Sequence, residues 1–356
     1  MLERLKTLCA LPGVSGHEGP VRAYLKKELA PLGLKTVVDP LGSLHVRRPG
    51  PGPRILLAAH MDEVGMVVSG IREDGTLAYS AAGLDARTLA GKRVRIGTGA
   101  PMAFGSFGAS ASQGSIPGVI GCKAIHLQKE EEFKRTFPHE ELYLDIGAKD
   151  KKEAAQAVRI GDPVWFDVEP MELGGLLCAK ALDDCIGCAI LLELLQEDYG
   201  CDLWAAFTVQ EELGLRGAMA TAHRAEPALA LVLEGTTAND LPELSPPKAV
   251  TRVGGGAALT VMDARTLALP EMVAALIKTA QRHAIPYQLR QGTKGGTDGG
   301  AIHQACCGCP VGGVSVPCRY IHSPNSLASP ADIRAAYELA RAFLRDQMWN
   351  EVIRHA

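Results

Sequence analysis

The sequence predicts an α/β fold in which a three-layer α/β/α domain is interrupted by a mostly β insertion domain. Two observations carry this prediction. After about residue 175, apolar strand-like runs alternate with amphipathic helical patterns, which is typical of a sheet covered by helices. From residue 69 to residue 165, short strand-like segments separated by Gly and Pro turns replace that rhythm. The predicted larger domain therefore consists of residues 1–68 and 166–356, and the insertion of residues 69–165.

The N-terminal part of the larger domain predicts two helices, a hairpin and a strand. Residues 2–33 carry two short amphipathic patterns separated by a Pro/Gly/Ser turn, and Gly33 is expected to end the second helix. Residues 34–48 predict a hairpin that turns at Pro40 to Gly42. Residues 53–70, PRILLAAHMDEVGMVVSG, are almost continuously apolar and predict one long strand of a sheet buried on both faces.

The insertion and the rest of the larger domain supply the remaining predicted elements. In the insertion, strands are expected within residues 75–81, 92–98, 118–127, 141–148 and 162–168, and one brief helix over residues 149–158. After residue 175, helices are expected over residues 183–198, 215–225, 270–284 and 331–350, and strands over residues 203–212, 229–235, 286–292 and 310–317. Residues 295–305 predict a loop that runs into a further short helix.

Composition and charge narrow the class of protein. The 37 Lys and Arg residues face 40 Asp and Glu residues, and a net charge of -3 does not indicate a nucleic-acid partner. No apolar run reaches the roughly 20 residues that span a bilayer, so no membrane partner is expected. Charges from residue 3 onward and a Pro-Gly pair at residues 12–13 argue against a signal peptide.

The ten cysteines are expected to be reduced thiols of a cytoplasmic protein, because they are spread over a long chain without an export signal. Two CxxC pairs, Cys185–Cys188 and Cys306–Cys309, could together form a zinc-ribbon site. The first pair lies in an apolar helical stretch, where small cysteines usually pack as core. The CCGC cluster at residues 306–309 is of interest for oxidation rather than as a ligand set.

Polar residues able to bind metals recur where predicted apolar strands end or a helix begins. Because open α/β sheets gather ligands at the carboxyl ends of their strands, these side chains are expected to converge. Each has an ordinary alternative, since a lone His or Glu at a strand end is common on surfaces and paired Asp residues can cap a helix. The conjunction of two histidines with several acidic residues favours a site. The residues are His60 and Asp62, Asp183 and Asp184, Glu211 and Glu212, Glu234, and His322.

Two histidines and three carboxylates are close to the ligand count of two divalent metal ions. Each ion could take one His, one terminal carboxylate and a shared bridging carboxylate, and such mixed sites suit Zn²⁺, Co²⁺ or Mn²⁺. One carboxylate must stay free as a general base. In the Glu211–Glu212 pair, one residue can bind metal while the other holds the water. Asp62 lies two residues after His60, where it can orient the imidazole.

Five motifs in order resemble the cytosolic co-catalytic metallo-aminopeptidases of the glutamyl-aminopeptidase and deblocking-aminopeptidase (tetrahedral, TET) family. The resemblance covers nearly the whole chain and includes the insertion, through IPGVIGCKAIHLQ and LYLDIGAKDKKEA. Each motif alone is weak, whereas five in the same order are a strong signal. The motifs are HMDEVG, KALDDCIG, QEELGLRGA, GGTDGGAIH and YIHSP.

The resemblance implies a role for each metal ligand. His60 and Glu234 would bind one ion, and Glu212 and His322 the other. Asp183 would bridge the two ions.

The same resemblance implies the catalytic residues and the assembly. Glu211 would be the general base, and Asp62 would orient His60. The peptide bond from Asp183 to Asp184 would be cis, a conformation that is rare outside proline. The protein would form a hollow dodecamer built from dimers, in which the insertion makes contacts between subunits.

The chain departs from the family pattern at two places. Glu234 stands where an aspartate is expected, which puts substrate preference and metal choice in doubt, and Asp240 is a nearby fallback ligand. In the insertion, CKAIHLQ differs from the expected KPPH-like form, and its His126 either approaches a neighbouring active site or is an exposed loop residue.

In the glycine-rich loop GTKGGTDGG, which is expected to line the pocket, Lys294 and Asp298 either contact substrate or are ordinary polar loop residues.

The sequence therefore predicts a two-metal aminopeptidase that removes N-terminal residues from short peptides, using a metal-bridging water and Glu211. Two alternatives stay open. One is a related metal-dependent carboxypeptidase or aminoacylase, for which Glu234 is the reason. The other is a non-catalytic assembly protein that binds peptides. The intact Glu211–Glu212 pair argues against it, because a binding protein needs no base.

Overall fold

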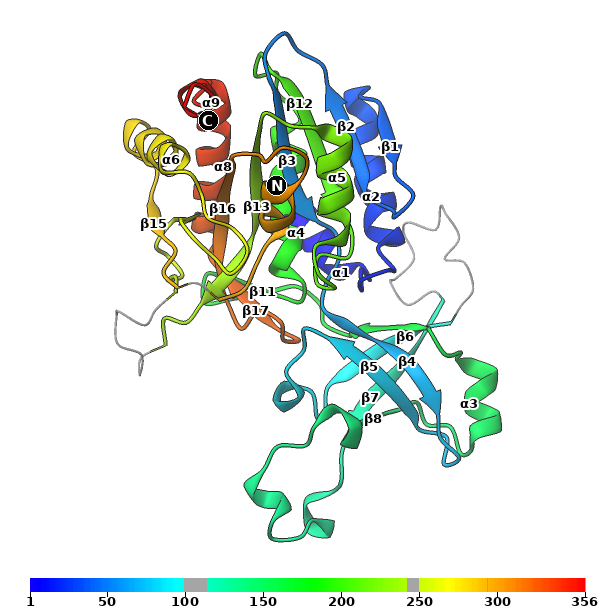
Figure 1. Ribbon diagram of the computed structural model, residues 1–356. Coiled ribbons are helices and arrows are strands. Elements are labelled where there is room, and N and C mark those ends of the chain that lie inside the picture. Colours follow the sequence, from blue (N-terminus) through cyan, green and yellow to red (C-terminus); the bar gives the residue numbers. More distant parts are fainter. Residues whose placement is uncertain (99–113, 242–249, 293, 356) are drawn as a thin grey trace.

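A computed structural model describes residues 1–98, 114–241, 250–292 and 294–355, whose strands form one large sheet and one small closed barrel (Figure 1). The barrel lies at the lower end of the molecule in Figure 1, below the large sheet and its helices. In spatial order, the large sheet contains β1 (Thr36–Val38), β2 (Leu44–Arg48), β12 (Asp202–Thr208), β3 (Arg54–His60), β13 (Leu229–Ala238), β16 (Val311–Arg319), β17 (Ser326–Ala328), β11 (Leu176–Ala179) and β10 (Met171–Leu173), and β14 (Ala257–Thr260) joins β16 to β15 (Tyr287–Leu289).

The side chains of β3 alternate between two hydrophobic cores, one on each face of the large sheet. Ile55, Leu57 and Ala59 belong to one core, and Leu56 and Ala58 belong to the other. Successive residues of a strand point to opposite faces, so helices must cover both faces of a strand that is apolar throughout. The predicted three-layer α/β/α architecture is confirmed. The helices on the first face are α1 (Leu2–Ala10), α2 (Gly19–Leu29), α4 (Leu182–Leu194), α6 (Pro270–Arg282), α8 (Pro330–Arg345) and α9 (Trp349–Ile353), and those on the second are α5 (Arg216–Ala225) and α7 (Asp298–Gln304).

The barrel has a separate hydrophobic core, formed by the inward-facing residues of its own strands. It starts at Gly65 and its last strand ends at Phe166. The predicted brief helix and four of the five predicted short strands are confirmed, whereas the strand expected over residues 118–127 ends at Gly121 and Ile125–Leu127 form a 3-10 helix. The closed order is β4 (Gly65–Ile71), β5 (Leu77–Ala82), β8 (Tyr143–Asp145), β7 (Ser115–Gly121), β6 (Arg93–Gly97) and β9 (Pro163–Phe166), and α3 (Lys151–Ala157) lies between β8 and β9 in the chain.

Several predicted elements of the larger domain differ in the structure. The strand expected over residues 203–212 ends at Thr208, so Glu211 and Glu212 follow it rather than close it. The single long strand expected over residues 53–70 is wrong, because β3 ends at His60 in the large sheet and β4 starts at Gly65 in the barrel. The strand expected to end at residue 235 continues to Ala238, because β16 pairs with it over this stretch. The single helix expected over residues 331–350 is two helices, since Gln347 between them has a φ of +52°. Among the described helices, none combines the length and apolar character that crossing a membrane requires.

Candidate functional site

The carboxyl ends of the central parallel strands meet at one edge of the large sheet. His60 is the last residue of β3 and is paired with Thr208, the last residue of β12. The register between β3 and β13 puts Glu234 two residues beyond their last pair, level with His60. His322 follows the end of β16, the next parallel strand. This is the edge at which open α/β sheets bind their ligands.

Asp183 lies between the two histidines. Its Oδ1 is 3.4 Å from Nε2 of His60, and its Oδ2 is 3.9 Å from Nε2 of His322. The same nitrogen of His322 is 3.4 Å from Oε1 of Glu212. In the described part of the chain, two groups have potential ligand atoms within 4.8 Å of one another: His60, Glu211 and Glu212, and Asp183, Glu212 and His322. The structure thus brings five of the predicted site residues together.

Glu234 lies outside both groups, although it is buried close to them. The hydroxyl of Ser315 donates a hydrogen bond of 3.3 Å to its Oε1. Burial, and then the negative charge of Asp183, raises the pKa of Glu234 well above its ordinary value. The fallback ligand Asp240 instead forms an ion pair with Arg319 through two hydrogen bonds of 2.7 Å each. Its carboxylate is therefore already engaged.

Asp62 holds the chain segment that carries the two neighbouring glutamates. Its Oδ1 accepts a hydrogen bond of 2.9 Å from the backbone N–H of Glu211, and its Oδ2 accepts one of 3.2 Å from that of Glu212. The Ser15 hydroxyl donates a further bond of 2.6 Å to Oδ2. Nδ1 of His60 is 2.9 Å from the backbone carbonyl oxygen of Asp62 and 3.5 Å from its Oδ1. The carbonyl is thus the closer partner of the imidazole, while the carboxylate fixes the glutamates.

Asp184 is joined to Asp183 by a cis peptide bond, as the resemblance implied. Its carboxylate accepts hydrogen bonds from the backbone N–H groups of His60, at 3.0 Å, and Gly187, at 2.7 Å. A β-carbon at Gly187 would lie 2.2 Å from the carbonyl oxygen of Leu233 and 2.5 Å from the Asp184 carboxylate, so only glycine fits there. Asp184 therefore anchors the end of β3 to α4.

Burial and mutual repulsion disfavour negative charge on the clustered carboxylates. Burial, followed by the nearby Asp298, Glu212 and Asp183 carboxylates, raises the pKa of Glu211 to about 9 against the opposing effect of His60. Burial raises the pKa of Glu212 to about 7. Cations placed among these groups would favour their ionised forms. Two imidazoles with several carboxylates are a donor set that Zn²⁺, Co²⁺ and Mn²⁺ accept, so the residues fit divalent metal ions.

Gly83, which directly follows the barrel strand β5, borders the cluster of candidate ligands. Gly83 has a φ of +69°, which a residue with a side chain rarely adopts. A β-carbon there would lie 2.7 Å from Cγ1 of Val64, 3.4 Å from Oε2 of Glu212 and 3.6 Å from Nδ1 of His322. The barrel therefore forms part of the wall around the candidate ligands.

Two buried contacts beside the site were not predicted. Nζ of Lys180 donates to both carboxylate oxygens of Glu63, at 2.6 and 2.8 Å, and to the Leu11 carbonyl oxygen, at 2.7 Å. Asp298 accepts a hydrogen bond from the Thr208 hydroxyl, while its buried Oδ1 has no partner among the described residues. Burial raises the pKa of Asp298 to about 6. A charged residue within an apolar segment, as Lys180 is in LLCAKAL, is the sequence signal that could have indicated the first contact.

The remaining candidates lie apart from the two ligand groups. The side chains of Lys294 and His126 are exposed, and Thr293, in the same glycine-rich loop as Lys294, is outside the described residues. Among the residues that the structure describes, no cysteine belongs to either group of potential metal ligands. Cys185 and Cys188 are buried in α4, as expected of core residues.

Comparisons with known proteins identify the family to which the chain belongs. Residues 42–339 match the family described as M42 glutamyl aminopeptidase. A glutamyl aminopeptidase of Lactococcus lactis is 31% identical over 356 residues, which cover 97% of this chain and 96% of the relative. The structure of a TET aminopeptidase from a marine sediment Thaumarchaeota archaeon is 33% identical and has a TM-score of 0.91, with 98% of each chain covered. The TET1 peptidase of Pyrococcus horikoshii is 29% identical with a TM-score of 0.84, covering 96% of this chain and 98% of its own. The chain therefore belongs to the M42 glutamyl aminopeptidase family, whose members are metal-dependent aminopeptidases.

Proposed function

We propose that this chain is a two-metal aminopeptidase that hydrolyses N-terminal residues from short peptides. The observation that carries the proposal is the position of Asp183, whose two oxygens face His60 and His322. Such an arrangement would allow one carboxylate to be shared between two ions. Membership of a metal-dependent aminopeptidase family supports the same reaction class.

The proposed ligands are His60 and Glu234 for one ion and Glu212 and His322 for the other, with Asp183 shared between them. Support for Glu234 comes from its burial at the level of His60, beside the negative charge of Asp183. Zn²⁺ is the first expectation for these ions, and Co²⁺ or Mn²⁺ the next. When bound, such ions would polarise the scissile carbonyl and acidify a water molecule.

The chain's own residues carry the proton transfers. Glu211 takes a proton from the attacking water and passes it to the leaving amine. The hydrogen bond from its backbone N–H to Asp62 holds Glu211 in place while this happens. The backbone carbonyl of Asp62 fixes the ring of His60, which leaves Nε2 directed at Asp183.

We also propose that residues 1–68 and 166–356 form the catalytic domain, and that residues 69–165 serve oligomerisation of a dodecamer built from dimers. The TET1 peptidase of P. horikoshii is described as able to assemble into a tetrahedron or a large octahedral shell. Large exposed apolar side chains in the insertion, Ile125, Leu127 and Phe133, would be covered by such contacts. We also propose a cytoplasmic location, because ten cysteines spread along a long chain are expected to be reduced thiols.

A related metal-dependent carboxypeptidase or aminoacylase is the second candidate. The observation that favours it is Glu234, whose longer side chain stands where an aspartate was expected. An extra methylene shifts either the metal ion or the free carboxylate oxygen, and both would alter how a substrate terminus is held.

The test compares metal-loaded protein on free-amine peptides with the same peptides acetylated at the N-terminus. Loss of the N-terminal residue from free-amine peptides alone, abolished by a chelator and restored by a divalent ion, is the expected result. Cleavage of the acetylated peptides, or release of C-terminal residues, would favour the second candidate. If two ions bind per chain and no peptide in a library is cleaved, the non-catalytic peptide-binding alternative is supported instead.

A further inference from the structure

A cysteine and a histidine form a close pair on the face of the sheet that α5 and α7 cover, apart from the metal ligands. Sγ of Cys306, just after α7, lies 3.3 Å from Nδ1 of His223, near the end of α5. Both side chains are exposed, and Cys306 has a φ of +54°. The thiol therefore has a potential proton acceptor beside it and is open to solvent.

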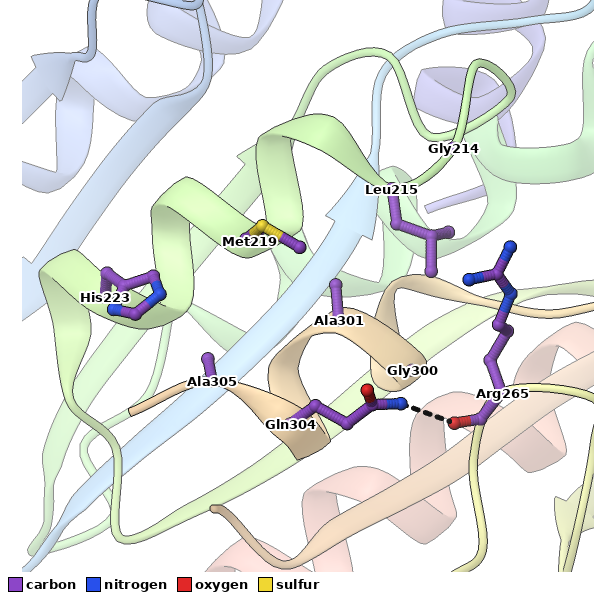
Figure 2. A pocket seen from close by; sticks show the side chains of 9 residues that line it. All are labelled: Gly214, Leu215, Met219, His223, Arg265, Gly300, Ala301, Gln304 and Ala305. Carbon is purple, nitrogen blue, oxygen red and sulfur yellow. Dashed lines mark hydrogen bonds between the residues drawn. The ribbon is translucent and has the colours of Figure 1, made fainter. Parts of the chain in front are cut away.

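The pair lies at the rim of a cavity of about 230 Å³ between α5 and α7. His223 and Ala305, the residue before Cys306, belong to the cavity wall, and Met219 and Ala301 make part of it apolar. Figure 2 places His223 at one end of the cavity and Arg265 at the other. The Arg265 side chain is exposed and has no carboxylate partner among the described residues, so this end offers a free cation.

Neighbouring cysteines lack this environment. Cys307 is exposed but has no imidazole in contact among the described residues. Cys309 is buried, and burial raises its pKa to about 12, which keeps the thiol protonated. Within the CCGC cluster, only Cys306 combines exposure with a histidine partner in the described structure.

We propose that Cys306 is a thiol-exchange site for small disulfides that carry carboxylates, with the cavity as the binding pocket. Arg265 binds a carboxylate of the disulfide, and the apolar wall contacts its body. The thiolate is the nucleophile in such exchange, and the adjacent imidazole accepts the proton that the thiol gives up. The sulfur of Cys306 attacks one sulfur of the reagent and forms a mixed disulfide. The other half leaves as a thiolate, and the proton that His223 accepted passes to this thiolate or, where the thiolate is a weak base, to water.

None of the residues substituted in the test is a candidate metal ligand or the proposed base. Thiol exchange and peptide hydrolysis can therefore be measured separately on the same variants. All ten cysteines of the chain lie in the described residues, and none is paired in a disulfide there. Thiol exchange can therefore be followed on the full-length protein.

The experiment follows release of the coloured thiolate from dithiobis-nitrobenzoate, an aryl disulfide with two carboxylates, on the folded full-length protein. One thiol per chain should react in a fast phase that is absent from Cys306→Ser and present in the matched control Cys307→Ser. Peptide mass mapping of the product should place the adduct on Cys306. A fast phase that survives Cys306→Ser would overturn the proposal.

Two further variants test the pocket. His223→Gln should slow the fast phase by at least about fivefold, because the proton acceptor is lost. In Arg265→Gln, the fast phase with the dianionic reagent should slow by at least about fivefold. The rate of the fast phase with neutral dithiodipyridine should change by less than about twofold. Unchanged rates in His223→Gln would refute the role of the pair, and equal effects of Arg265→Gln on both reagents would refute recognition of the carboxylate.

Discussion

The backbone N–H of Glu211 donates a hydrogen bond of 2.9 Å to Oδ1 of Asp62, so a residue that follows β3 holds the peptide that carries the proposed base. The same carboxylate also binds the Glu212 N–H and the Ser15 hydroxyl. One buried side chain therefore sets the positions of a candidate base and a candidate metal ligand together.

Replacing Asp62 by Asn should lower kcat while both metal ions stay bound. An amide has one accepting oxygen and a nitrogen that donates, so it cannot accept from all three donors. A decrease in kcat of about 10- to 100-fold is expected, because Asp62 hydrogen-bonds the segment that carries the candidate base and a candidate ligand. Steady-state kinetics and metal analysis of the purified variant check this. Ser15→Ala, which removes only one donor, is the control and should change kcat by less than about threefold.

Glu211→Gln should retain both metal ions and lose turnover. Removing a general base typically lowers the rate by about 10²- to 10⁴-fold, since the amide cannot take the proton of the attacking water. Asp183→Asn is the matched comparison and should lose metal as well as activity, because its carboxylate faces both histidines. Substantial activity in Glu211→Gln would show that another residue is the base.

Without metal, Glu211 should make the folded chain less stable as the pH rises. Burial raises its pKa from 4.5 to about 9, so between these values the folded state keeps a proton that the unfolded chain has released. The contribution of Glu211 to stability is therefore full below pH 4.5 and is lost progressively toward about pH 9. In chelator-treated protein, the free energy of unfolding in urea should fall more steeply over this range than in Glu211→Gln. Parallel curves for the two proteins would contradict the raised pKa.

Gly83→Ala should impair activity more than its effect on stability explains. The positive φ makes alanine strained by about 1–2 kcal/mol, and the new methyl group would crowd Val64 and approach Glu212 and His322. Gly91→Ala is the matched control, because Gly91 has a similar φ of +77° and open space around it. Both variants should lose stability through the same backbone strain, Gly83→Ala by more because of the contact with Val64, and a drop in kcat/KM on the order of tenfold or more is expected only in Gly83→Ala. Equal kcat/KM values for the two variants would show that the barrel does not form part of the wall of the site.

Lys180→Met should lower the free energy of unfolding by about 3–5 kcal/mol, because Glu63 would keep a buried charge without its partner. The double variant Lys180→Met with Glu63→Gln should recover a large part of this loss, since glutamine is neutral and still accepts the Gly13 N–H. Urea unfolding of the two single variants and the double variant measures the coupling. Additive losses would mean that the two side chains do not stabilise each other.

The central strands and the positions of the candidate ligands that follow them were predictable, because burial on both faces leaves a plain sequence pattern. The run ILLAA before His60 is apolar at every position, which marks a central strand of a covered sheet. Polar residues directly after such strands must lie at the carboxyl edge of the sheet. The placement of His60, Glu211 and Glu212 follows from this reasoning alone.

Other features depend on partners that no local pattern identifies. Asp62 and Glu211 are 149 residues apart in the chain, and Glu63 and Lys180 are 117 residues apart. The sequence around Asp62 indicates only a contact with the neighbouring His60. The hydrogen bonds from the backbone of Glu211 and Glu212 to the Asp62 carboxylate were therefore not predicted. The extension of β13 to Ala238 likewise depends on pairing with β16, which is a tertiary contact.

The order of strands in the large sheet couples two parts of the candidate site. Among the described strands, β10 and β11, which lead into Asp183, join the sheet only through β17. His322 lies in the short connection between β16 and β17. The strands that precede Asp183 and the connection that carries His322 therefore depend on the same short strand, β17, for their place in the sheet. A substitution that loosens β17 would disturb two sides of the candidate site at once.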